Sequence, residues 1–248
     1  MRLLLLFLIY AAILSVALAR KGVRSSPGTA YAAAEPNPIR VLIVGATGGT
    51  GRQLVAQALE RGHEVTALVR NPSALGVEHP RLRVVRGDVL DYASVDAAMQ
   101  GQQAVLSALG HRRFFQPTRI LSDGTRNLLR AMEAGGVRRF VCETSLGIGD
   151  SAGRMGLYYT FFVIPIVLPF YFWDKARQEQ AIAQSDVSWV IVRPGVLTNE
   201  VRRARYRHGR RVGSFLRTVR ISRADVADFM LNQLTDNTYL SAAPGVCW

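Results

Sequence analysis

The chain is short of lysine and cysteine. Of its 31 basic residues only two, Lys21 and Lys175, are lysine. Its two cysteines, Cys142 and Cys247, are far apart in the sequence, so the pattern favours neither a disulfide framework nor a cysteine-rich metal site. With 248 residues and a 49% hydrophobic composition, the chain is large enough for one α/β domain with a full core and no disulfides.

Acidic residues are also scarce: there are 18, which leaves a net charge of +13. Such a balance normally suggests a nucleic acid or an anionic membrane as partner. Arginine replaces lysine almost throughout, however, so a general preference for arginine accounts for much of the charge. Residues 202–220 are strongly basic, and we expect an extended or hairpin excursion that covers the substrate or contacts anionic lipid. A solvated surface is equally compatible, and no nucleic acid is expected.

Residues 1–19 are interpreted as a signal peptide or a signal anchor. The apolar run from Leu3 to Leu18 ends in Ala-Leu-Ala at 17–19, which resembles a signal-peptidase site. The alternative is an uncleaved anchor, since roughly 16 apolar residues can just span a bilayer. Arg2 stands alone before the run, whereas Arg20 and Lys21 follow it, so the positive-inside rule favours an anchor that keeps the rest of the chain in the cytoplasm. Export after signal cleavage is the other possibility.

Residues 20–38 predict a flexible tether, because the stretch is rich in Ala, Pro, Gly and Ser from residue 25 onward. Residues 39–248 then form the folded domain. No internal repeat is visible in it.

Residues 41–51 contain the most informative motif of this domain. Four apolar residues predict a strand buried on both faces, and glycines at 45, 48 and 51 follow before a helical run. The first glycine permits a sharp turn, the second lets backbone N–H groups approach a pyrophosphate, and the third lets the helix pack closely on the sheet. The pyrophosphate would lie on the helix N-terminus. The predicted cofactor-binding residues here are Gly45, Thr47, Gly48, Gly49, Thr50 and Gly51.

The end of the second predicted strand indicates which dinucleotide is bound. Enzymes that prefer NAD usually carry an acidic residue there for the ribose 2′-hydroxyl. This chain has Val69, Arg70 and Asn71 instead. Arg70 would attract a 2′-phosphate, and Arg52 could reach the same group, so the prediction is NADP, with NADPH preferred over NADH. The alternative for Arg70 is a solvated strand end.

Asp88 and Val89 follow the third predicted strand, at the edge of the sheet where the adenine of a dinucleotide lies. Asp88 could accept a hydrogen bond from the adenine amino group while Val89 packs against the ring. An ordinary turn or helix cap is an equally good explanation of Asp88.

The remaining pattern predicts a Rossmann-like α/β fold, namely a doubly wound parallel sheet in a three-layer sandwich and a single domain. Strands are expected at 41–44, 64–69, 82–86, 104–109, 139–144 and 189–192, with helices at 53–61, 94–100, 119–134, 174–185 and 223–234. Residues 193–195 are expected to form a loop. Residues 157–173 form an apolar and aromatic run that we interpret as a hydrophobic lid or pocket wall. A membrane-dipping surface or plain core are alternatives.

Five motifs carry a family resemblance. They are Val-Gly-Ala-Thr-Gly-Gly-Thr-Gly at 44–51, Leu-Val-Arg-Asn-Pro at 68–72, Gly-Asp-Val at 87–89, Asp-Lys-Ala-Arg-Gln-Glu at 174–179 and Val-Arg-Pro-Gly at 192–195. Together they resemble the atypical short-chain dehydrogenase/reductase superfamily, in particular its NAD(P)H-binding group of NmrA-like proteins and NADPH-dependent flavin reductase (biliverdin reductase B). The resemblance covers about residues 39–246 and implies the fold and the cofactor, but not the substrate.

The same resemblance implies catalytic residues, because short-chain reductases typically use Ser, Tyr and Lys. Tyr171 and Lys175 are four residues apart and so share a helix face, with Ser145 upstream. Lys175 would help Tyr171 to donate a proton and would also bind the cofactor, while Ser145 would hold a substrate carbonyl. Alternatively, Tyr171 merely ends an aromatic run, since atypical members often lack the catalytic tyrosine. Glu179 could pair with Lys175 or cap the helix.

The sequence therefore predicts an NADPH-dependent oxidoreductase that transfers hydride to a hydrophobic or planar acceptor such as a flavin, quinone or enone. The cofactor would supply the chemistry and the protein the orientation. The alternative function is a non-catalytic NADP-binding redox sensor or a membrane-associated assembly factor.

Overall fold

The computed structural model describes residues 2–21, 38–111 and 113–248. Most of the tether predicted over residues 20–38 therefore lies outside the described residues. The domain that follows begins with its first strand at Arg40.

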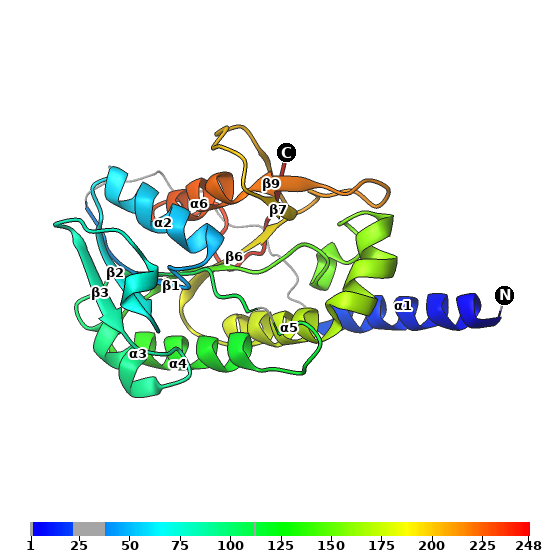
Figure 1. Ribbon diagram of the computed structural model, residues 1–248, viewed down its shortest axis with the longest axis horizontal. Coiled ribbons are helices and arrows are strands. Elements are labelled where there is room, and N and C mark those ends of the chain that lie inside the picture. Colours follow the sequence, from blue (N-terminus) through cyan, green and yellow to red (C-terminus); the bar gives the residue numbers. More distant parts are fainter. Residues whose placement is uncertain (1, 22–37, 112) are drawn as a thin grey trace.

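An eight-stranded sheet forms the centre of the domain (Figure 1). Its strands are β1 (Arg40–Val44), β2 (Glu64–Val69), β3 (Leu82–Arg86), β4 (Ala104–Ser107), β5 (Arg139–Glu143), β6 (Ser188–Pro194), β8 (Arg207–Gly209) and β10 (Gly245–Cys247). They lie in the order β3-β2-β1-β4-β5-β6-β10-β8, with every pair parallel except β10 and β8. The strand order reverses between β1 and β4, and ligands of such sheets bind outside the carboxyl ends of the strands at this point.

Helices cover both faces of the sheet, as the sequence predicted. On one face lie α2 (Gly49–Glu60) and α6 (Arg223–Asn232), and on the other lie α3 (Tyr92–Met99), α4 (Ile120–Ala134) and α5 (Pro169–Ala183). Alternate residues of β1 face the two helical layers, because side chains alternate along a strand. Val41 and Ile43 pack with α2 and α6, whereas Leu42 and Val44 pack with α3 and α4. This is a three-layer Rossmann-like sandwich.

Short elements complete the domain. They are η1 (Pro72–Ala74), η2 (Gly149–Ser151), the π-helix η3 (Tyr159–Val167) and a two-stranded parallel sheet of β7 (Val196–Thr198) and β9 (Arg220–Ser222).

Two helices begin earlier than the sequence predicted. The helix α2 begins at Gly49 rather than residue 53, directly at the glycine-rich turn. The helix α5 begins at Pro169 rather than residue 174, with the proline in its first turn, where the missing N–H costs nothing. Tyr171 and Lys175 therefore share one regular helix, as the four-residue spacing requires.

The loop expected at residues 193–195 is in part a strand. The strand β6 continues through Arg193 and Pro194, which pair with Gly245 and Val246 of β10. The basic stretch at 202–220 is likewise not a hairpin on itself, since Arg207–Gly209 pairs with β10. In both cases the partner strand is far along the chain and leaves no local signal in the sequence.

The N-terminal residues form the helix α1 (Arg2–Lys21), which packs along η3, η2 and α5. The Tyr10 hydroxyl donates to the Pro165 carbonyl oxygen (3.3 Å), and Lys21 Nζ lies 3.7 Å from the centroid of the Trp173 ring. Among the described residues, no helix has the length and apolar character needed to cross a membrane.

The apolar run at residues 157–173 is mostly a surface segment. Thr160, Ile164 and Pro165 of η3 are buried, but Tyr158 and Phe162 are exposed. The alternative that the run is plain core is therefore wrong for much of its length, because η3 packs through only one side.

Candidate active site

The glycine-rich turn joins β1 to the first turn of α2. Gly45 has a φ of 76°, and a Cβ atom there would lie 2.3 Å from the Ala108 carbonyl oxygen. A Cβ at Gly51 would lie 2.0 Å from the Gly45 carbonyl oxygen. Gly48 is the N-cap of α2 and offers no side-chain cap, so no capping side chain occupies the first N–H groups of the helix. This cradle fits the diphosphate of a dinucleotide.

The hydroxyl of Thr50 is directed into the protein rather than toward this cradle. It donates to Glu143 Oε1 (3.1 Å), at the end of β5. The carbonyl oxygen of Thr47 accepts from Arg52 Nε (3.2 Å). Thr50 thus holds the turn against β5, and Thr47 holds it against α2. Both residues were predicted to bind the diphosphate.

Arg52 ties the loop after β2 to α2. Its guanidinium donates to the carbonyl oxygens of Leu75 (2.8 Å) and Ala74. Arg70 is exposed where β2 ends and precedes that same loop. Arg70 and Arg52 thus border the loop where the sequence predicts the 2′-phosphate, and Arg52 holds this loop through its backbone carbonyl oxygens.

Asp88 and Val89 lie after β3. Asp88 Oδ1 accepts from the backbone N–H of Leu90 (3.0 Å), as in an ordinary turn. The Val89 side chain fills the space beside Gly124, whose Cβ would lie 2.7 Å from it, and the Val89 carbonyl accepts from Asn127 (2.9 Å). Val89 is thus packed against α4.

The predicted catalytic residues come from α5 and the end of β5. Lys175 Nζ donates to the Thr144 carbonyl oxygen (2.9 Å) and lies 5.2 Å from the centroid of the Tyr171 ring. The Tyr171 hydroxyl lies 3.4 Å from the position of a Cβ on Gly110, in the loop after β4. Ser145 follows Thr144 directly, and its hydroxyl contacts Met155 Sδ at 3.7 Å. The structure brings Tyr171 and Lys175 together beside the carboxyl ends of β4 and β5.

His111 joins this group, although the sequence analysis did not select it. Its ring centroid lies 4.8 Å from that of Tyr171 in an edge-on arrangement. Burial lowers the pKa of His111. The charge of Asp174 opposes this effect and that of Lys175 adds to it. The imidazole is therefore largely neutral at pH 7. A histidine directly after Gly110 in the loop that follows β4 was the available signal.

Asp174 fixes the position of Lys175. The fully buried Asp174 carboxylate accepts from the backbone N–H groups of Leu121 (2.9 Å) and Ser122 (3.2 Å), at the N-terminus of α4. Charge–dipole attraction favours a carboxylate at this helix end. The residue next to Lys175 is therefore anchored to a second helix.

Glu179 does not pair with Lys175, which was one of the two roles that the sequence left open for it. It accepts two hydrogen bonds from the guanidinium of Arg193, at 2.9 and 2.7 Å, and one from the Thr144 hydroxyl at 2.8 Å. Both charged side chains are fully buried. The reason is that β6 continues through Arg193 and directs its side chain toward α5.

Glu143 is a buried acid at the glycine-rich turn. Burial raises the pKa of its carboxyl, against the opposing effects of Lys175, the Thr50 hydrogen bond and Arg223. Because the folded protein binds this proton more tightly than the unfolded chain, the stability that Glu143 contributes is present at low pH and lost as the pH rises through the raised pKa.

Glu143→Gln is therefore expected to raise the melting temperature at neutral and alkaline pH but not below about pH 4. Thermal melts of the cofactor-free protein from about pH 3 to 9 would measure this, with the exposed Glu64→Gln as control. A difference between Glu143→Gln and the native protein that does not change with pH would contradict the prediction.

Arg223, the first residue of α6, lies over the glycine-rich turn and was also missed. A Cβ on Gly49 would lie 2.4 Å from Arg223 Cδ and 2.5 Å from Nε, and Arg223 Nη1 donates to Asn199 Oδ1 (2.6 Å). The Arg223 side chain therefore occupies the space that a side chain at position 49 would fill. No local pattern relates two residues so far apart in the sequence.

We expect Arg223→Gln to weaken NADPH binding about tenfold, because a charge-assisted contact to the diphosphate would be lost. Titration by nicotinamide fluorescence would measure this, with the exposed Arg220→Gln as control. Binding of ADP should weaken as well, whereas binding of adenosine should not. Equal NADPH affinities of the native protein and Arg223→Gln would refute the role.

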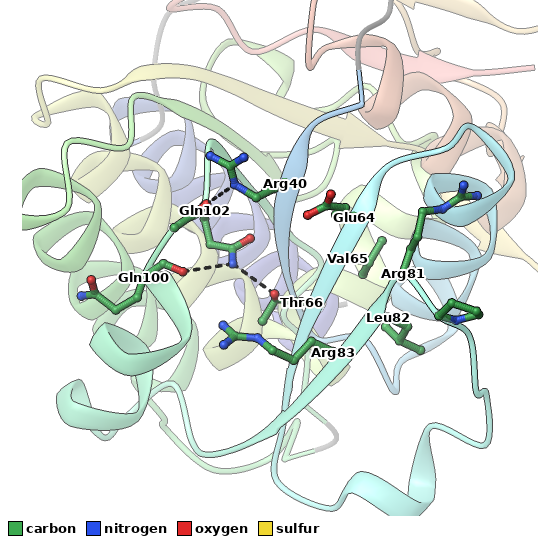
Figure 2. A pocket seen from close by; sticks show the side chains of 11 residues that line it. Arg40, Glu64, Val65, Thr66, Arg81, Leu82, Arg83, Gln100 and Gln102 are labelled. Carbon is green, nitrogen blue, oxygen red and sulfur yellow. Dashed lines mark hydrogen bonds between the residues drawn. The ribbon is translucent and has the colours of Figure 1, made fainter.

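A separate cleft of about 390 Å³ opens at the opposite edge of the sheet. Figure 2 shows it between the amino ends of β1, β2 and β3, with Arg40, Glu64 and Arg83 around it and Gln102 donating to Thr66. It lies away from the glycine-rich turn, since parallel strands place that turn at their carboxyl ends, and it contributes nothing to the cofactor site.

The parallel sheet, the reversal of strand order at β1 and the glycine cradle define a dinucleotide-binding protein of the Rossmann class. A comparison with protein families agrees, because the model of the NAD(P)H-binding family matches residues 45–237. The chain belongs to this NAD(P)H-binding family, which confirms the resemblance seen in the sequence motifs.

Individual relatives and structures are consistent with this. The chain is 34% identical over 176 residues to an uncharacterized chloroplastic protein of Arabidopsis thaliana (65% of this chain, 60% of that protein). It is 32% identical over 177 residues to a 3-diazoavenalumate denitrifying reductase of Streptomyces sp (64% and 56%). It thus spans about 60% or less of the length of these relatives. The solved structure of ChuY, an anaerobillin reductase from Escherichia coli O157:H7, shares the fold with a TM-score of 0.69 at 22% identity (84% of this chain, 96% of that chain).

Proposed function

We propose that the protein is an NADPH-dependent oxidoreductase that transfers hydride to a hydrophobic or planar acceptor such as a flavin, a quinone or an enone. The observation that carries this proposal is the aromatic cluster beside Lys175. The Tyr171 ring stands edge-on to His111 at 4.8 Å and to Phe114 at 5.7 Å. Aromatic rings at the carboxyl end of a dinucleotide-binding sheet suit a flat, apolar acceptor.

The residues of the chain would act by orientation and proton transfer. The bound nicotinamide cofactor supplies the hydride. Tyr171 would donate a proton to the acceptor, and Ser145 would donate a hydrogen bond to its carbonyl oxygen. Lys175, held by the Thr144 carbonyl and by its neighbour Asp174, would keep a positive charge beside the Tyr171 ring.

The preference for NADPH over NADH rests on the end of β2. Arg70 is exposed there and Arg52 holds the adjoining loop, while no acidic residue follows Val69 directly. Arginine binds a phosphate well, and a carboxylate would repel it.

The experiment uses the full-length protein with NADPH and NADH, followed by a panel of flavins, quinones and enones monitored at the nicotinamide absorbance. We expect tighter NADPH binding and oxidation by one acceptor class. Tyr171→Phe and Lys175→Met should each lower kcat by roughly 10²-fold or more, whereas the exposed Tyr158→Phe should not change it.

A non-catalytic NADP-binding redox sensor or membrane-associated assembly factor is the second candidate. The exposed apolar residues of α1 and η3 favour it, because they offer a surface for association. Tight NADPH binding without oxidation by any acceptor would replace the reductase proposal with this one.

We further propose that residues 3–18 hold the protein at a membrane, with the domain in the cytoplasm. Leu5, Leu6 and Ile13 of α1 are largely exposed, which supports contact with lipid. Cell fractionation should find the full-length chain with the membranes and protected from protease added outside. A mature N-terminus near Arg20 would instead establish export after cleavage.

A further inference from the structure

Three segments far apart in the sequence form one exposed apolar surface beside the cofactor domain. We call it the apolar face; its main residues are Leu6, Ile13, Tyr158, Phe162, Ile166 and Leu216. The ring centroid of Phe162 lies 5.8 Å from that of Phe7 and 6.2 Å from that of Tyr158. The ring centroids of Phe161 and Phe215 are 6.5 Å apart. In Figure 1, α1 runs along η3 and the loop before β9 approaches η3 from the other side. Ring contacts therefore link α1, η3 and this loop.

The apolar face is strongly exposed to solvent. The exposed fraction is 62% for Tyr158, 48% for Phe162, 53% for Ile166 and 70% for Leu216. Monomeric soluble proteins rarely expose contiguous apolar patches that extend over several elements. A partner that covers the face is the physical expectation.

The charges around the face select the kind of partner. Residues 2–21, 151–173 and 209–222 contain eight basic side chains and no acidic one. Among them Arg20 and Lys21 end α1, while Arg210, Arg211 and Arg217 belong to the loop. A second copy of the chain would bring like charges together, which opposes self-association. An anionic lipid surface offers both an apolar interior and complementary charge.

We propose that the apolar face docks on the surface of an anionic bilayer. Phe162 and Ile166 of η3 would enter the acyl boundary together with the exposed side of α1. Arg211 and Arg217 would contact lipid headgroups. This goes beyond attachment through residues 3–18, because η3 and the loop belong to the cofactor domain and would orient it on the membrane.

Docking would also place the candidate active site near the bilayer. The helix α5 starts directly after η3, with Phe170 exposed and Tyr171 next to it in the aromatic cluster with His111. An apolar acceptor dissolved in the membrane would then have a short path to Tyr171. This consequence rests on the proposed reductase function, but the docking itself does not.

Hydrogen–deuterium exchange of the full-length protein tests the proposal directly. The protein is mixed with phosphatidylcholine vesicles containing either no or 30% phosphatidylglycerol, and peptides from residues 157–170 and 209–217 are followed. We expect slower exchange of both segments only with the anionic vesicles. Protection confined to α1 would overturn the proposal while leaving the attachment through residues 3–18 intact. Protection without vesicles, together with a dimer by light scattering, would assign the face to a second copy.

Variants separate the apolar from the electrostatic contribution. Phe162→Glu with Ile166→Glu should abolish protection of residues 157–170, and Arg211→Glu with Arg217→Glu should remove the preference for anionic vesicles. The controls are Leu90→Glu with Val77→Glu and Arg83→Glu with Arg138→Glu, which change exposed residues elsewhere. Unchanged NADPH binding by each variant shows that it folds. The proposal would be contradicted if both variants of the apolar face kept the slow exchange that the native protein shows with anionic vesicles.

Discussion

Gly51→Ala is expected to lower NADPH affinity by roughly 100-fold and stability by about 2 kcal/mol or more. The added Cβ would lie 2.0 Å from the Gly45 carbonyl oxygen and 2.8 Å from Ala46 Cα. These are backbone atoms, so the clash can be relieved only by opening the turn that faces the diphosphate. The cradle and the contact of α2 with β1 would be damaged together.

The matched control is Gly136→Ala, a glycine in open space at the end of α4. It has a positive φ of 66°, so alanine there should cost about 1 kcal/mol and leave cofactor affinity unchanged. Fluorescence titration and urea unfolding would measure the two effects. If Gly51→Ala bound NADPH as well as Gly136→Ala does, the turn described above could not be the cofactor site.

Arg193→Met is expected to destabilise the protein by about 3–5 kcal/mol, because it leaves the buried Glu179 carboxylate without its guanidinium. Arg193 and Glu179 share two hydrogen bonds and are both fully buried. Asp150, which also pairs with Arg193, is partly exposed and can turn to water. Urea unfolding of cofactor-free protein would measure the loss.

A double variant distinguishes a lost attraction from an unpaired charge. Arg193→Met with Glu179→Met should be more stable than Arg193→Met alone, since the uncompensated carboxylate is removed as well. If the second substitution lowered stability further, burial of the lone carboxylate would not be the cause of the first loss.

Local patterns predicted much of the fold. The strands at 64–69 and 82–86 have the predicted bounds, because each is a short segment rich in β-branched and apolar residues with turn residues on both sides. The glycine-rich turn was found from the glycine spacing and its position between a predicted strand and a helical run, since a backbone turn at a helix N-terminus imposes its own residue types. The pairing of Tyr171 with Lys175 is also local, as it follows from one turn of helix.

Contacts between distant segments were not predictable in this way. The strand β10 joins the sheet beside β6, and the basic segment at 207–209 pairs with it. Three residues of such a strand carry too little pattern to be recognised. Three side-chain contacts were also not predictable: Arg223 with Gly49, Thr50 with Glu143 and Arg193 with Glu179. Each contact joins elements that only the folded sheet brings together.

The packing of α1 on η3 has a consequence for biosynthesis. The sequence places η3 about 140 residues after α1. At about 5–20 residues per second, the ribosome needs roughly 7–30 s to synthesise the surface on which the helix packs. During this interval the apolar side of α1 has no partner within its own chain. A targeting factor or a nearby membrane can bind it in that time, before the nascent domain competes for the same helix.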